Sequence, residues 1–428
     1  MDRWKYFALC LALVFSACGY AYEVEDGIYE VEYEIEYEIE EVFFSGRTRQ
    51  EYLDDLDFLY NTLVENFPFF GVIYRKLGVD MHQHFRETRA IIETTDNIFS
   101  DGNFANIVDG SFLRHARGLG HLNMMSDSRM VRSHLFFFSN DDTRVNFLAE
   151  LNNPATRALH NLTDEDFMPP ILGEESIIHA AASRNIQTEI IEEGRIAYVN
   201  IISMNAATMH LDEVTLLEFF HEVADYEHLI IDIRQNGGGD SRFFPELVVA
   251  PNISEPLSWK NHLFLMGGEH NRYILEPWKG EFGAGTPLRP INDMAIAMLP
   301  ELECDDLPLL EYYFRRQIVV HPSFDSAIFG GKIWLLVSER VFSASEAAAS
   351  MVKQTGFATL VGQTTGGDGV GFQPIVLALP NTGIVVRYSA AYGVDFLGRN
   401  NQEFGTEPCV FNMPGKDAME TVLYLIRG

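Results

Sequence analysis

The segment His228-Leu-Ile-Ile-Asp-Ile-Arg-Gln-Asn-Gly-Gly-Gly239 joins a short apolar run to three consecutive glycines. The run has the length and composition of a buried strand. Residues 332–337 and 357–361 repeat the apolar pattern, and residues 343–354 between them have a helical pattern. Strands that alternate with helices are typical of a mainly parallel sheet covered by helices. We therefore expect residues 191–428 to form an α/β core.

The part of the chain before this core has a different pattern. Apolar residues recur there at helical spacing, ahead of a proline at position 68: Leu53, Leu56, Leu59, Leu63 and Phe67. A second helical pattern follows over residues 80–95. These spacings predict a mostly helical N-terminal domain over residues 46–190.

The first 18 residues have the features of an export signal. Arg3 and Lys5 precede an apolar run that is too short to span a bilayer, and the run ends in F-S-A-C at Cys18. Small residues before a cysteine resemble a bacterial lipobox, so we expect a lipid anchor on Cys18 of a cell-surface protein. Plain cleavage near this point, which would release a secreted protein, is the alternative. Residues 19–45 are predicted to be an acidic linker.

The charge of the chain narrows the range of partners. It has 62 acidic and 31 basic residues, which gives a formal net charge of −31. Nucleic acid is recognised through a basic surface, so we expect no nucleic-acid partner. An anionic membrane surface would also repel the chain, and we expect membrane contact only through the lipid anchor.

Two positions suggest acyl-transfer chemistry. Ser343 begins a helix, where unpaired backbone N–H groups and the helix dipole favour a developing negative charge. Serine is also a common helix cap, so this position alone does not identify a nucleophile. The glycine run at 237–239 follows a strand and lets the backbone approach a ligand closely. We expect the N–H groups of Gly238 and Ala344 to bind an oxyanion.

Four motifs occur in a specific order: D-I-R-Q-N-G-G-G (232–239), V-F-S-A-S-E-A-A-A (341–349), L-V-G-Q-T-T-G-G-D-G (360–369) and G-T-E-P (405–408). In this order they resemble the carboxy-terminal processing, or tail-specific, serine protease family, which includes the tricorn core peptidase and repeats of the interphotoreceptor retinoid-binding protein. The resemblance covers about residues 190–412. It implies a crotonase-like catalytic core with Ser343 as the nucleophile, and it implies no metal or organic cofactor.

One residue departs from the family pattern. Many members use a lysine base in a G-K-G sequence, and Asp368 stands at the matching position here. An aspartate is a much weaker base than a neutral lysine and carries the opposite charge. His121, in the turn R-G-L-G-H-L, is similar to the general base of the tricorn-like branch. The resemblance therefore implies an exported serine endopeptidase that forms an acyl-enzyme on Ser343 with His121 as base.

The remaining expectations concern the third catalytic group and the substrate. The tricorn-like branch places a glutamate near its G-x-x-P motif, and we favour Glu403 over Glu407 for this role. The strand predicted over 383–388 could pair with an extended peptide or protein substrate, in which case Arg387 could bind a substrate carboxylate. The alternative function is a catalytically silent relative that binds a peptide or an apolar ligand in the same cleft.

Overall fold

The computed structural model describes residues 46–95, 100–138, 144–168, 185–276, 289–291, 296–297 and 299–428. The predicted signal segment, Cys18 and the predicted acidic linker lie outside these ranges. No helix within the ranges is long and apolar enough to span a membrane.

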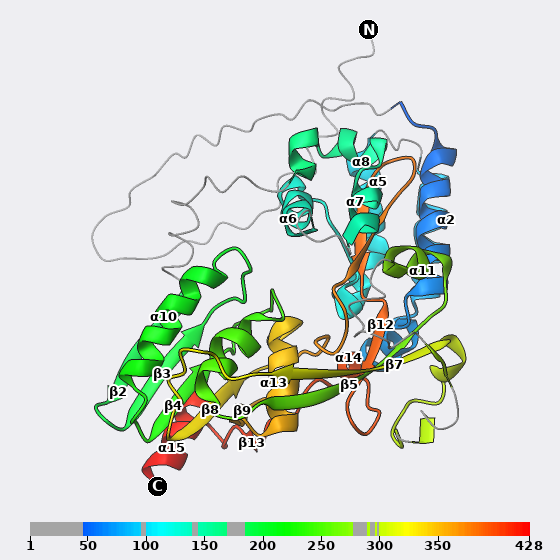
Figure 1. Cartoon of the computed structure of the whole chain (residues 1–428). Coiled ribbons are helices and arrows are strands. Elements are labelled where there is room, and N and C mark those ends of the chain that lie inside the picture. Colours follow the sequence, from blue (N-terminus) through cyan, green and yellow to red (C-terminus); the bar gives the residue numbers. More distant parts are fainter. Residues whose placement is uncertain are drawn as a thin grey trace, which may run out of the picture. The chain divides into compact units, whose positions relative to one another are not determined.

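The largest sheet forms the centre of the α/β core (Figure 1). Its strands are mostly parallel, and only the edge strand β2 is antiparallel to its neighbour. Across the sheet they are β13 (Val410–Phe411), β9 (Thr359–Gly362), β8 (Lys332–Val337), β4 (His228–Asp232), β3 (Ile196–Ile201) and β2 (Ile186–Glu192). The prediction of an α/β core is confirmed.

Each face of this sheet is covered by helices because successive side chains of a strand point to opposite faces. Leu229 and Ile231 of β4 face the core that contains apolar residues of α10 (Met209–Glu222) and α13 (Ala344–Thr355). Ile230 faces the opposite core, with Val422 of α15 (Ala418–Arg427). The sheet is therefore the middle of three layers, and the ends of its strands are left free for a site.

The region before the core is mostly helical, as predicted (Figure 1). Its longer helices are α2 (Arg49–Asn66), α3 (Phe70–Leu77), α4 (Met81–Thr94), α5 (Asp101–Ser111) and α6 (Ser128–Phe138). Shorter elements are η2 (Leu113–Ala116), η3 (Leu119–His121), β1 (Asn123–Met124), α7 (Val145–Leu151), α8 (Pro154–Leu159) and η5 (Asp164–Phe167). A capping box of Thr48 and Glu51 begins α2, because each side chain accepts a hydrogen bond from the other residue's backbone N–H.

Two antiparallel sheets complete the fold. One has the order β12 (Ala391–Val394), β5 (Leu257–Leu265), β7 (Tyr312–Val320) and β6 (Arg289–Pro290), and the other has the order β1, β11 (Val385–Tyr388) and β10 (Ile375–Ala378). Four further elements connect these parts: η6 (Pro245–Val249), η7 (Ala250–Asn252), α11 (Glu269–Leu275) and η9 (Leu307–Leu309). A short helix, α14 (Asn401–Phe404), follows β12.

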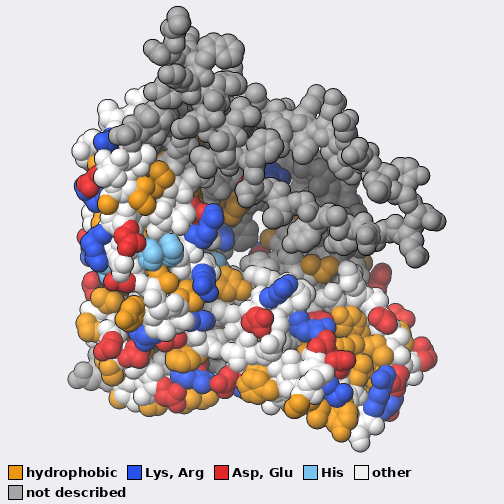
Figure 2. Space-filling view, turned by 180° about the vertical axis from the view of Figure 1, so that it is seen from behind, with side chains coloured by type: hydrophobic (Ala, Val, Ile, Leu, Met, Phe, Trp, Pro, Cys, Tyr) orange, Lys and Arg blue, Asp and Glu red, His pale blue; other side chains and the backbone are white. Residues whose placement is uncertain are grey.

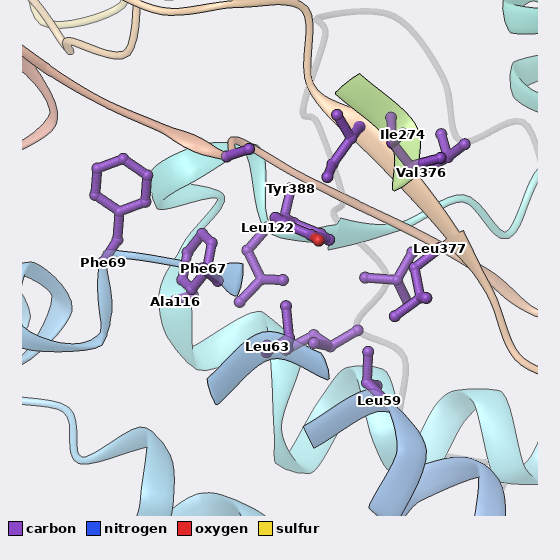
Figure 3. Close-up of a cluster of buried hydrophobic side chains, with 14 of the residues drawn as sticks. Leu59, Leu63, Phe67, Phe69, Ala116, Leu122, Ile274, Val376, Leu377 and Tyr388 are labelled. Carbon is purple, nitrogen blue, oxygen red and sulfur yellow. The ribbon is translucent and has the colours of Figure 1, made fainter. Parts of the chain in front are cut away.

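The helices and these antiparallel strands share one hydrophobic core. Leu59, Leu63 and Phe67 lie in the same cluster as Leu377 and Tyr388 (Figure 3). The cores of the molecule therefore do not divide at residue 190, and the domain boundaries inferred above stay a prediction.

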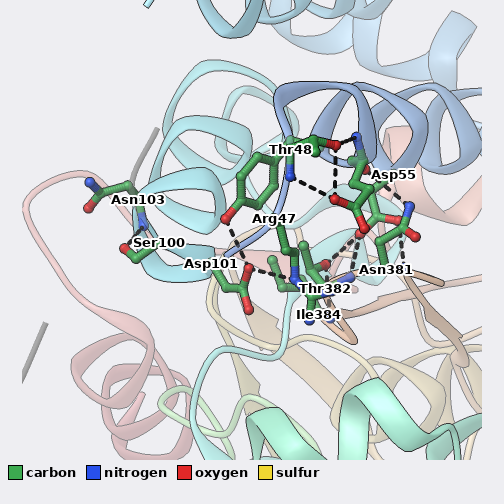
Figure 4. A network of polar contacts seen from close by, with 11 residues as sticks. Arg47, Thr48, Asp55, Ser100, Asp101, Asn103, Asn381, Thr382 and Ile384 are labelled. Atoms are coloured by element: carbon green, nitrogen blue, oxygen red, sulfur yellow. Dashed lines mark hydrogen bonds and ion pairs between the residues drawn. The ribbon is translucent and has the colours of Figure 1, made fainter. Parts of the chain in front are cut away.

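Polar contacts also hold the helical region against the antiparallel strands. The buried carboxylate of Asp55 on α2 accepts hydrogen bonds from the backbone N–H groups of Asn381 and Thr382, at 2.9 and 2.8 Å (Figure 4). It also accepts the hydroxyl of Thr382 at 2.6 Å. Helix α2 is thereby attached to the hairpin of β10 and β11, which leads into the candidate site.

Strand β11 corrects one expectation about the substrate. It lies between β1 and β10, with Arg387 opposite Asn123 on one side and opposite Val376 on the other. Because both edges of this short strand are already paired, it has no free edge for an extended peptide. The expected strand pairing with substrate is therefore wrong.

Candidate active site

Ser343 is held in an uncommon backbone conformation where the chain enters α13. It is the N-cap residue with φ 57° and ψ −124°, and its side chain makes no capping hydrogen bond. Its N–H donates to the carbonyl of Gly367 at 3.2 Å. A residue with positive φ other than glycine is strained, and such residues cluster at functional sites. The hydroxyl is thus free of the capping role that the sequence left open.

His121 reaches this hydroxyl from the helical region. Its Nε2 lies 3.0 Å from Oγ of Ser343, and the ring is almost entirely buried. The ring also packs against Phe342, with centroids 4.8 Å apart. The turn that carries His121 depends on Gly120, where an added Cβ would lie 2.5 Å from a ring atom of Phe67. The structure thus brings together two residues that are 222 positions apart.

The other ring nitrogen of His121 faces two oxygen groups. Nδ1 lies 3.0 Å from Oγ of Ser389 and 2.6 Å from Oδ2 of Asp368. Only the contact with Ser389 is a hydrogen bond, whereas Oδ2 of Asp368 forms a close ionic contact and has no hydrogen-bond partner. The carboxylate therefore acts on the ring as a close negative charge, and Ser389 accepts the directed bond.

This arrangement determines which nitrogen carries the proton. Oγ of Ser389 lies 3.1 Å from Oδ1 of Asp368, and an ionised carboxylate can only accept. Ser389 therefore donates its one proton to Asp368 and accepts from Nδ1–H of His121. Nε2 is then unprotonated and can accept the hydroxyl proton of Ser343, as a general base must.

The loop that carries Asp368 has an uncommon backbone conformation at this residue. Asp368 has φ 62°, so Ser343, His121 and Asp368 all have positive φ. The side chain of Gln402 donates to Oδ1 of Asp368. The sequence singled out Asp368 as the residue that replaces a lysine, but it gave no sign that the carboxylate would contact His121. Ser389 and Gln402 carried no sequence signal.

Glu403, the expected third group, has a different partner. Its carboxylate binds Arg75 of α3 at 2.7 Å, and Arg75 also binds Asp306 at 2.7 Å. Glu403 makes no hydrogen bond with His121 in the part of the chain that the structure describes. Its neighbour Gln402 points to Asp368 instead, and Glu407 is exposed. The ion pair of Glu403 attaches α14 to the helical region.

The glycine loop packs directly against the nucleophile. A Cβ added to Gly238 would lie 2.8 Å from Cβ of Ser343 and 2.9 Å from the backbone N of Ala344. However, the N–H of Gly238 donates to Oδ1 of Asn236 at 2.9 Å, within its own loop. Among the described residues, the N–H of Gly239 has no hydrogen-bond acceptor. Gly238 would have to release Asn236 before it could bind an oxyanion.

Ser345, the other serine of S-A-S-E, has a structural contact. It is fully buried, and its hydroxyl lies 2.9 Å from the carbonyl oxygen and 2.7 Å from Oδ1 of Asn236. These bonds fasten the first turn of α13 to the glycine loop. Ser343, rather than Ser345, is therefore the serine next to His121.

A buried acid lies behind the site. Glu346 in the first turn of α13 has no exposed surface, and burial raises its pKa to about 7. Its Oε1 accepts from Asn401 at 2.7 Å and from Thr406 at 2.6 Å, whereas Oε2 has no partner. Oδ1 of Asn401 in turn accepts from the N–H groups of Gly369 and Val370. Glu346 is thus connected to the loop that carries Asp368.

Comparison with known proteins identifies relatives of this chain. The sequence model of peptidase family S41 matches residues 195–410, which is half of the chain. No curated protein sequence matches.

Solved structures with the same fold have low sequence identity. A putative peptidase from Parabacteroides merdae has a TM-score of 0.53 at 17% identity, and the match covers 90% of this chain and 98% of that one. Mature CPAF has a TM-score of 0.52 at 13% identity, with 89% and 96% covered. CPAF complexed with lactacystin has a TM-score of 0.50 at 14% identity, with 89% and 97% covered.

Proposed function

This chain belongs to peptidase family S41 and is a serine peptidase, and from this premise we propose that Ser343 is its nucleophile and His121 its general base. The observation that carries the proposal is the 3.0 Å contact between Nε2 of His121 and Oγ of Ser343. We further propose that Asp368, rather than Glu403, supports the histidine, directly as a negative charge and through the hydroxyl of Ser389. Its carboxylate lies 2.6 Å from Nδ1 and would stabilise the imidazolium that forms during the reaction.

The proposed reaction has two steps. Ser343 gives its proton to Nε2 of His121 as its oxygen attacks the peptide carbonyl, and the N–H of Ala344 and one N–H of the glycine loop bind the oxyanion. His121 then donates the proton to the leaving amine. Water, activated by the same histidine, hydrolyses the acyl-enzyme and releases the acid product.

The proposal is tested with a fluorophosphonate probe, which labels activated serines. The full chain is compared with Ser343→Ala and His121→Ala, and with two matched controls at exposed positions, Ser258→Ala and His210→Ala. We expect both site variants to lose labelling and peptide hydrolysis and both controls to keep them. Labelling that survives Ser343→Ala would refute the nucleophile assignment. A folded parent that is neither labelled nor active would favour the silent, ligand-binding alternative.

We also propose that the protein is exported and anchored through Cys18. The support is the sequence of residues 1–18, since the structure does not describe this segment. Expression in a bacterium with a labelled fatty acid tests the anchor. Labelling of the parent and loss of both labelling and membrane association in Cys18→Ser are expected. An unlabelled protein in the medium would indicate plain secretion instead.

A further inference from the structure

Arg387 is on β11 (Val385–Tyr388), two residues before Ser389, whose hydroxyl contacts His121. It is also paired in register with Asn123, which is two residues after His121. Arg387 is therefore one strand repeat, about 7 Å, from the residue that accepts the bond of His121.

The positive charge of Arg387 is only weakly compensated. Its Nε donates to Oδ1 of Asn123 at 3.1 Å. In the described part of the chain, its two terminal nitrogens have no hydrogen-bond acceptor and no carboxylate forms an ion pair with it. Other partly buried arginines differ: Arg75 binds Asp306 and Glu403, and Arg234 binds Asp232 and Asp417.

The surroundings of Arg387 do not supply the missing anion. Burial lowers the pKa of Arg387, because it disfavours the charged form of the guanidinium. His134 of α6 interacts with it electrostatically, but burial lowers the pKa of His134 to about 4, so this ring is neutral at pH 7. The charge of Asp368 opposes the lowering of the pKa of Arg387, but Asp368 forms no ion pair with it; this carboxylate instead contacts Ser389, Gln402 and His121.

A half-buried guanidinium that has no carboxylate partner costs folding free energy, and a carboxylate of a ligand would offset this cost. The planar fork of an arginine fits a carboxylate with two parallel hydrogen bonds. We infer that Arg387 binds a carboxylate of the substrate, because its guanidinium lies close to the residues that support His121 and has no carboxylate partner among the described residues. This inference rests on the proposed peptidase function and names the substrate class for that site.

The negative net charge of the chain does not prevent Arg387 from binding a carboxylate. Figure 2 shows Lys and Arg side chains among the Asp and Glu side chains on the face drawn, so that face is not uniformly negative. A pocket of 430 Å³ borders on Phe342, and its lining has charges of both signs, from Lys76, Arg117 and Glu339.

The test compares hydrolysis of matched peptides. A panel places Glu or Gln at each position from two residues before to two residues after the cleaved bond, and each peptide is made as the free acid and as the amide. The parent is compared with Arg387→Met and Arg387→Lys. Arg117→Met is the matched control, since it removes a positive charge from the pocket without touching β11. Fluorophosphonate labelling is measured for every variant.

We expect the parent to prefer one Glu peptide to its Gln partner. Arg387→Met should lower kcat/KM for that Glu peptide roughly 10- to 100-fold, mainly through KM, and leave the Gln peptide nearly unchanged. Arg387→Lys should restore part of the preference, and Arg117→Met should keep it. A preference for the free acid over the amide would identify the chain terminus, rather than a side chain, as the source of the carboxylate.

Different experimental outcomes would refute this inference and the proposed function. A parent that is not labelled refutes the peptidase mechanism. A labelled parent without any preference for a carboxylate refutes the role of Arg387. If Arg387→Met slows labelling and lowers kcat equally for all peptides, Arg387 acts through Asp368 and does not bind substrate.

Discussion

Oδ2 of Asp368 lies 2.6 Å from Nδ1 of His121, although the two residues are on different sides of the interface between the helical region and the core. Asp368 is at the position that, by the resemblance described above, matches the lysine base of a G-K-G sequence. A negative charge at this position cannot take the proton of Ser343, but it can stabilise a protonated His121. We therefore propose that Asp368 supports His121 as the base, in place of a lysine base on this loop.

Asp368→Asn should keep the size of the side chain and remove its charge. We expect kcat for peptide hydrolysis to fall by about 10²- to 10⁴-fold, because the imidazolium loses its counter-charge and the tautomer of His121 is no longer fixed. Glu403→Gln is the matched control. It removes an ion pair with Arg75 and should change kcat little. Equal losses of kcat in the two variants at equal stability would contradict the role of Asp368.

Gly238→Ala should abolish activity. The added Cβ would lie 2.8 Å from both the carbonyl oxygen of Phe342 and Cβ of Ser343, and Gly238 has φ 109°. The loop or the nucleophile must then move. Gly237→Ala is the matched control, since a Cβ there meets nothing within 4 Å. Labelling rates of the two purified variants check the prediction, and similar rates would argue against close packing of the glycine loop on Ser343.

Gly120→Ala should displace His121. Its Cβ would lie 2.5 Å from the ring of Phe67, whereas a Cβ on Gly118 meets nothing within 4 Å. Both glycines have positive φ, so both alanine variants bear a backbone strain of roughly 1–2 kcal/mol. Only Gly120→Ala should also lose most of its hydrolytic rate. Equal rates in both variants would show that the turn adapts without moving the histidine.

Glu346 should make stability depend on pH. Its pKa is raised from 4.5 to about 7 in the folded chain, so its contribution is fully present below pH 4.5 and is lost as the pH rises through about 7. The shift corresponds to about 3 kcal/mol of unfolding free energy. Glu346→Gln does not titrate, so its stability relative to the parent should rise by about this amount between pH 4.5 and pH 8.

Denaturant unfolding across this pH range measures the difference. Glu339→Gln is the control, because Glu339 is exposed. Its unfolding curve should follow that of the parent at every pH. A constant difference between Glu346→Gln and the parent would show that Glu346 keeps one protonation state throughout.

Local sequence patterns predicted the framework of the site well. The strand over residues 332–337 was predicted with its observed bounds, and the helix predicted over residues 343–354 is observed as Ala344–Thr355. Both predictions depend on hydrophobic periodicity, which acts within a few residues. The order of the four motifs predicted Ser343 as the nucleophile, and the similarity of the turn R-G-L-G-H-L to the tricorn-like branch predicted His121 as the base; the structure places these two side chains in contact.

What the sequence determined by itself was the α/β core and the identity of a serine at a helix N-terminus, because both arise from short-range spacing. Only the tertiary structure decided that Asp368, Ser389 and His121 meet, that Glu403 binds Arg75, and that β11 is an inner strand. These contacts join segments that are tens to hundreds of residues apart. Their geometry depends on how the helices and the antiparallel strands pack into one core, which no local pattern specifies.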